Sequence, residues 1–144
     1  MEQQKNELKR QVTKLKNEKK MQLSVAYEYL TNGIQLIKYG RRGKPKPMHI
    51  YLFEKLICWR DPTDMSLPNL KKKNDRQIPL NSIKEIKEGR DTQVFKKWPI
   101  KNKEDERIKF SFSIISDSRT LDLEAPSEIE KLLFIDKLKM VLTD

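Results

Sequence analysis

GIQLIKYGRRGKPKPMHIYLFEKLICWR, residues 33–60, contains the clearest strand pattern in the chain. Side chains along residues 34–39 follow the two-residue period of a β-strand, and residues 48–53 and 56–60 are two further short runs that read as strands. Residues 40–47, between the first two runs, contain two Gly and two Pro, as a connecting loop does. Only Glu54 and Lys55 separate the second run from the third. The stretch therefore predicts an antiparallel meander of three strands.

The sequence after this meander continues in short strands and ends in a helix. Four more strands are expected at residues 77–80, 83–87, 108–115 and 120–123. The final helix is expected over 127–142, where Pro126 suits the first turn and apolar residues share one broad face. These apolar residues are Ile129, Leu132, Leu133, Ile135, Leu138 and Val141. A helix of this kind can close the open end of a sheet.

The sequence before the meander predicts one long helix. Residues 1–32 contain neither Gly nor Pro, and Thr31-Asn32-Gly33 supplies the stop. We therefore divide the chain into a basic amphipathic N-terminal helix, residues 1–32, and a domain, residues 33–144. The first half of the helix is expected to be solvated and the second half to pack on the domain. A docking role toward a protein partner stays open.

The composition narrows the function classes. The chain has 144 residues, with 31 Lys and Arg against 21 Asp and Glu, a net charge of +10 that points to an anionic partner. A single cysteine, Cys58, excludes an internal disulfide framework, and we expect no metal site and no cofactor. His49 and Cys58 lack a third group to orient them, so we expect no catalytic residues and no enzyme activity.

The order of the elements, seven short antiparallel strands and a closing helix, resembles a pleckstrin-homology domain over roughly residues 30–143. The stretches that carry the resemblance are 33–40, 43–46, 83–92 and 120–125. The resemblance implies a mainly β fold with α: a seven-stranded antiparallel barrel or sandwich, capped by the C-terminal helix and preceded by the N-terminal one. Phe134 stands in place of the family's tryptophan, and Met48 in place of a signature arginine that binds inositol phosphates.

Basic residues gather around the first loop, with five in the nine positions from Lys38 to Lys46. If residue 50 pairs with residue 59, Arg60 falls at the same open end. The predicted headgroup-binding residues are Lys38, Arg41, Arg42, Lys44, Lys46 and Arg60. The lysine run of the long polar loop is expected to make peripheral membrane contacts, through Lys71, Lys72 and Lys73.

These patterns favour a non-enzymatic module that recruits its protein to the anionic cytoplasmic face of a membrane, either the plasma membrane or a secretory organelle. Phosphatidic acid is the preferred ligand because Met48 replaces the signature arginine, and because the chain is similar to an acylated branch of the family in apicomplexan parasites that reads this lipid. Phosphoinositide binding and protein interaction or scaffolding are the alternatives. Nucleic acid is not expected, since the sequence lacks an aromatic-rich sheet face and a reading helix.

Overall fold

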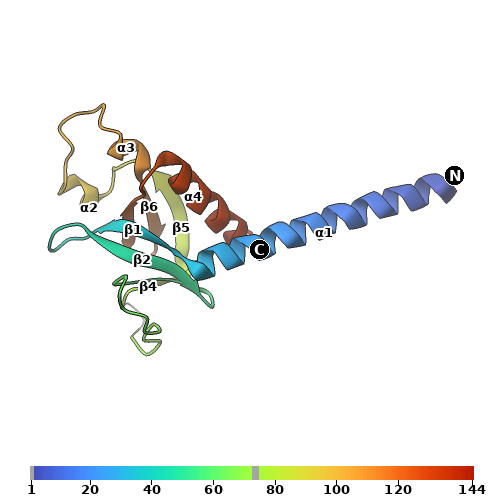
Figure 1. The fold of residues 1–144 in the computed structure, drawn as a ribbon, viewed down its shortest axis with the longest axis horizontal. Helices are drawn as coiled ribbons and strands as arrows, with labels where there is room; N and C mark the ends of the chain where they lie inside the picture. Colours follow the sequence, from blue (N-terminus) through green and yellow to red (C-terminus); the bar gives the residue numbers. More distant parts are fainter. Residues whose placement is uncertain (1, 73–74) are drawn as a thin grey trace.

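A long helix precedes the sheet. The structure, a computed structural model, describes residues 2–72 and 75–144. Helix α1 (Glu2–Asn32) ends at Gly33, whose φ of 72° lies in the left-handed region that favours glycine. A Cβ at Gly33 would stand 2.4 Å from the Ile50 carbonyl oxygen, so this close approach also requires glycine. The predicted helix is confirmed, and beyond the sheet it extends alone (Figure 1).

The described strands form one antiparallel sheet of seven, in the order β4-β3-β2-β1-β7-β6-β5. The strands are β1 (Ile34–Tyr39), β2 (Lys46–Phe53), β3 (Leu56–Arg60), β4 (Gln77–Pro79), β5 (Ile83–Glu88), β6 (Ser111–Ser116) and β7 (Thr120–Glu124). A short 3-10 turn, η1 (Leu80–Ser82), joins β4 to β5. The predicted fold class is confirmed, although the sheet stays open, because β4 and β5 are its two edges within the described residues.

The pairing of the first three strands follows the prediction. In the β2–β3 hairpin Ile50 lies opposite Trp59, and the turn at Glu54 has a φ of 54°. Strand β1 then pairs with β7 as well as with β2. This second pairing joins residues more than eighty positions apart and brings the β6–β7 turn beside the β1–β2 loop.

The core lies between the concave side of the sheet and two helices. Its fully buried members include Leu36, Ile50, Phe112 and Leu121 from the sheet, and Leu30 from α1. Burial of each such side chain stabilises the fold by roughly 1.5–3 kcal/mol.

The closing helix, α4 (Glu128–Leu142), begins at Ser127, whose hydroxyl accepts a hydrogen bond from the Glu130 amide at 3.1 Å. It buries Phe134, Ile135, Leu138 and Val141, as expected. The predicted face was wrong in one part, because Ile129, Leu132 and Leu133 are exposed. The helix carries apolar residues on several sides, so their spacing alone does not show which side is buried. The buried side also contains Lys131, whose Nζ lies 2.7 Å from Oε1 of Glu88.

The segment between β5 and β6 differs most from the expectation. It contains two short helices, α2 (Gln93–Lys96) and α3 (Arg107–Phe110), so residues 108–110 are helical and β6 starts three residues later than predicted. Thr92 caps α2 by accepting from the Phe95 amide. Phe95 then packs on the outer side of the sheet against Tyr39, with 5.0 Å between ring centroids. This contact holds the segment beside the end of β1.

Candidate functional site

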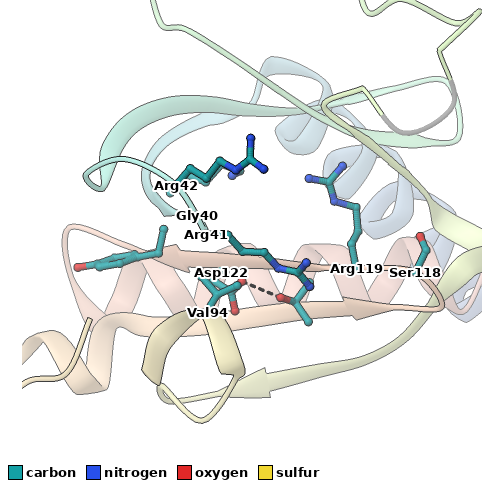
Figure 2. A pocket seen from close by; sticks show the side chains of 10 residues that line it. Gly40, Arg41, Arg42, Val94, Ser118, Arg119 and Asp122 are labelled. Atoms are coloured by element: carbon teal, nitrogen blue, oxygen red, sulfur yellow. Dashed lines mark hydrogen bonds between the residues drawn. The ribbon is translucent and has the colours of Figure 1, made fainter. Parts of the chain in front are cut away.

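A hollow of about 470 Å³ opens at the end of β1, where the β1–β2 loop, the β6–β7 turn and α2 meet (Figure 2). Arg42 and Arg119 enter it from opposite sides, and Arg41 extends across the side where Asp122 lies. The lining residues are Lys38, Tyr39, Gly40, Arg41, Arg42, Val94, Ser118, Arg119, Thr120 and Asp122.

Lys38 and Arg119 share one aromatic ring in this hollow. Lys38 lies on the core side of β1, at the strand's open end, and its Nζ is 5.7 Å from the centroid of the Trp59 ring. The Arg119 guanidinium carbon is 4.8 Å from the same ring. Each cation is attracted to the electron-rich face of the indole. The buried Trp59 therefore holds two positive charges close together at the mouth of the sheet.

The local field at Lys38 is positive. Burial lowers the pKa of the Lys38 ammonium below its ordinary value, and the charge of Arg119 lowers it further, against an opposing effect of Asp122. Lys46 and Arg76 add smaller effects in the same direction as Arg119. Burial also lowers the pKa of Arg119, followed by the charge of Arg41. A bound anion would reverse this repulsion.

Asp122, the buried carboxylate of the hollow, is occupied by hydroxyl groups. It accepts hydrogen bonds from Ser113 and Thr120 at 2.7 Å each, and a third from Thr92. Across residues 2–72 and 75–144, no ion pair within 4.0 Å joins Lys38, Arg41 or Arg42 to a carboxylate. Within the described residues, the charges of Lys38, Arg41 and Arg42 are therefore not neutralised by an ion pair.

Four of the six predicted headgroup residues lie together. Lys38, Arg41 and Arg42 line the hollow, and Lys46 lies directly across the β1–β2 ladder from Lys38. Lys44 is exposed on the β1–β2 loop but does not line the hollow.

Arg60 is placed elsewhere. Side chains alternate along β3, so while Trp59 points into the core, Arg60 lies on the outer side of the sheet. Its guanidinium stacks 4.1 Å from the Tyr51 ring centroid and its Nε–H donates to Nδ1 of His49 at 3.1 Å. The second ring nitrogen of His49 is left to donate to the Asn32 carbonyl at 2.9 Å. Arg60 therefore braces the junction of β2 and α1.

The predicted peripheral lysines lie outside the hollow. Lys71 and Lys72 are exposed in the loop between β3 and β4, and neither lines the hollow. Lys73 lies outside the described residues. Whether this loop touches a membrane stays a prediction.

Met48 does not lie at the mouth of the sheet, where the family resemblance placed it in the position of the signature arginine. Its side chain is 2% exposed and lies opposite Leu36 in the core, one layer beneath the mouth. Lys46 is the β2 residue opposite Lys38, so the β2 residue at the mouth is a lysine and not Met48. The methionine at position 48 therefore does not disfavour inositol phosphates.

The sequence did not point to Arg119 or Arg76. Arg119 enters the site only because β7 pairs with β1, a long-range contact that alternation within each strand cannot show. Trp98 is half-buried and its indole N–H donates to the Gly40 carbonyl at 3.2 Å. Its place in a short loop beside Pro99 gave no signal of this bond.

The described residues show no cluster of three or more His, Cys, Asp or Glu side chains that could hold a metal ion. Among the described helices, none combines the length and the apolar character that crossing a membrane needs.

Comparison with known proteins gives one family. The sequence profile described as "Pleckstrin homology domain" matches residues 27–143. The fold is similar to that of inner membrane complex sub-compartment protein 1 from Toxoplasma gondii, with a TM-score of 0.57, 14% identity, and 86% of this chain and 93% of that chain covered. It is also similar to the human TBC1 domain family member 2 PH domain, with a TM-score of 0.52, 19% identity, and 75% and 76% covered.

A third similar structure is described as the PH domain from PfAPH, with a TM-score of 0.51, 16% identity, and 85% of this chain and 89% of that chain covered. At these identities the structural likeness concerns the fold.

Proposed function

The chain belongs to the pleckstrin homology domain family, whose members bind phospholipids or proteins, and from this premise we propose that it is a non-enzymatic module that binds anionic phospholipid. The binding site is the hollow beside Lys38, and the ligand is the phosphate of a lipid headgroup on the cytoplasmic face of a membrane. The observation that carries the proposal is the pair of cations, Lys38 and Arg119, held on one Trp59 ring.

The chemistry of this pair suits a phosphate. Ammonium and guanidinium groups donate several hydrogen bonds to phosphate oxygens, and the bonds are strengthened by charge. Because burial and like charges lower the pKa of Lys38, binding of an anion is expected to raise that pKa and to strengthen the bond.

We propose phosphatidic acid as the preferred ligand and a phosphoinositide as the alternative. Lys38 and Arg119 both lie within 6 Å of one Trp59 ring, and a pair of cations held this closely suits a single phosphate monoester better than a ring bearing several phosphates. The similarity to the acylated apicomplexan branch supports the same choice. Lys46 opposite Lys38 is what keeps the phosphoinositide alternative open.

The surrounding loops add an electrostatic attraction to the membrane. Arg41, Arg42 and Lys44 lie on the β1–β2 loop, and a basic residue near an anionic leaflet contributes about 1 kcal/mol. Attraction of this size gives reversible binding, so stable residence on a membrane needs a second anchor.

Sedimentation with vesicles tests the proposal. Phosphatidylcholine vesicles carry phosphatidic acid, phosphatidylserine or a polyphosphoinositide at equal total charge, and the native chain is expected to sediment best with phosphatidic acid. Arg119→Glu changes two charges at the site, so its affinity should fall by about 2 kcal/mol, or roughly thirtyfold. Lys55→Glu, in the turn at the opposite end of the strands, is the matched control and should bind like the native chain.

The outcomes separate the alternatives. Equal binding to all three anionic lipids would reject the headgroup preference while leaving an electrostatic membrane module. Unchanged binding by a folded Arg119→Glu variant would reject the site.

A further inference from the structure

The N-terminal part of α1 carries an apolar stripe without a partner in the described structure. All side chains from residue 2 to residue 22 are exposed, and this part of the helix runs away from the sheet (Figure 1). Leu8, Val12 and Leu15 lie on one helix face at the spacing i, i+4, i+7, and are 60%, 48% and 64% exposed. A single solvated helix gains nothing from such a stripe, so the stripe calls for a covering surface.

The stripe has a defined direction and a charged border. At 100° per residue it lies in line with Ala26 and Leu30, which are buried against the domain. The stripe therefore faces the same side as the part of α1 that packs on the sheet. A row of lysines at helical spacing borders it, formed by Lys5, Lys9, Lys16 and Lys20.

The outward face of α4 is a second apolar surface, and the exposed charges of its first turns, residues 128–136, are acidic, whereas Lys137, 3.8 Å from Asp136, and the exposed Lys139 follow toward its C-terminal end. Ile129, Leu132 and Leu133 are 78%, 46% and 41% exposed. Between residues 128 and 136 the exposed charged side chains are all acidic: Glu128, Glu130 and Asp136. Lys131, the one basic residue in this stretch, is buried and paired with Glu88.

We propose that these two surfaces are the two halves of one contact between copies of this chain. The apolar stripe of α1 packs on the outward face of α4 in a second copy, with the lysine row against the acidic residues. The second copy returns the same contact, which gives a closed dimer with twofold symmetry.

The geometry favours a second copy over the chain's own α4. Residues 26 and 30 fix α1 on the domain, and the helix has no Gly or Pro at which to fold back. Residues 2–22 extend for roughly 30 Å at 1.5 Å per residue. This length exceeds that of α4, whose 15 residues span about 22 Å. One projecting helix can therefore cover one α4 face.

Charge reversal tests the contact in the full chain by sedimentation velocity over a range of concentrations. The first variant carries Lys9→Glu with Lys16→Glu, and the second carries Glu128→Lys with Asp136→Lys. The native chain is expected to dimerise and each variant alone to be monomeric, because both of its contacts set like charges together. An equimolar mixture should form mixed dimers, since both contacts then pair opposite charges.

Three results would overturn the proposal. One is that the native chain stays monomeric at every concentration. This result would overturn the proposal even if the α1 stripe were found to bind vesicles instead. Another is that the variant carrying Glu128→Lys and Asp136→Lys still dimerises, which would mean that two α1 helices pair with each other. The last is a mixture that stays monomeric although both variants are folded.

Apolar substitutions give an independent measurement. Leu15→Gln and Leu132→Gln should each weaken dimerisation about tenfold, because each removes apolar area from the contact. Both residues are exposed in one copy, so circular dichroism should stay unchanged, and so should the melting temperature at dilutions where the native chain is also monomeric. Leu67→Gln is the matched control, since Leu67 is 68% exposed in the β3–β4 loop, away from both surfaces. An equal loss for Leu67→Gln would also count against the proposal.

Discussion

Phe134→Ala tests whether α4 holds the sheet together. The side chain is 1% exposed, and its ring centroid is 5.6 Å from that of Phe112 in β6. The sheet cannot collapse onto the space that the ring leaves, because α4 is also held by Leu138 and Val141. Truncation should therefore lower the free energy of unfolding by about 3–5 kcal/mol, the range for buried aromatic residues.

This loss is a large share of the stability of such a domain, which is about 5–15 kcal/mol. For a chain of this length, a loss of 1 kcal/mol lowers the melting temperature by roughly 3–4 °C, so the expected shift is about 10–20 °C. Differential scanning calorimetry measures it. Vesicle binding should disappear at the temperature where the variant unfolds, because the hollow is built from loops that the sheet positions.

Leu133→Ala is the matched control from the neighbouring position. Leu133 is 41% exposed on the outward face of α4, so its truncation should change the stability of one copy by about 0.5 kcal/mol or less. Equal shifts for the two variants would refute the inward and outward assignment of the helix faces. A Phe134→Ala protein that melts like the native chain would show that the ring is not part of the core.

Three further perturbations probe the site and the core. Arg41→Glu, Arg42→Glu and Lys44→Glu combined should abolish vesicle binding at moderate salt and leave the melting temperature unchanged, since all three are exposed; a folded variant that still sediments contradicts the loop's role. Met48→Arg should destabilise the domain instead of improving inositol phosphate binding, because the residue is buried opposite Leu36; urea denaturation measures the loss, and native stability would contradict the assigned register. Burial raises the pKa of Cys58 to about 11, so the native thiol should resist alkylation at pH 8 and react once urea unfolds the chain; rapid native labelling would contradict its burial.

Local patterns in the sequence were enough to predict the elements that make up the sheet. Alternation located β1 and β7, short apolar runs located β2 and β3, and the two-residue turn at Glu54 set the β2–β3 register. The start of β6 was missed because Ile108 and Phe110 fit the alternation of a strand although they lie in a helical turn. The N-terminal helix was predictable because nothing in residues 1–32 interrupts it.

The candidate site was only partly predictable, for two physical reasons. Arg119 depends on the pairing of β1 with β7, which no local pattern encodes. Arg60 depends on which side of β3 faces the core: because Trp59 points inward, the next residue, Arg60, points outward. The outward face of α4 was missed because a helix apolar on several sides does not show which side is buried.

The chain's two tryptophans, Trp59 and Trp98, do not line the hollow themselves, but each contacts residues that do. The Trp59 indole lies beneath two cations, and the Trp98 indole is hydrogen-bonded to the loop that carries Arg41 and Arg42. An anion that draws those cations toward itself changes the electric field on one ring, and a movement of the loop changes the hydration of the other. The protein's intrinsic fluorescence therefore comes almost entirely from its candidate binding site, so ligand titrations can be followed without attaching a dye.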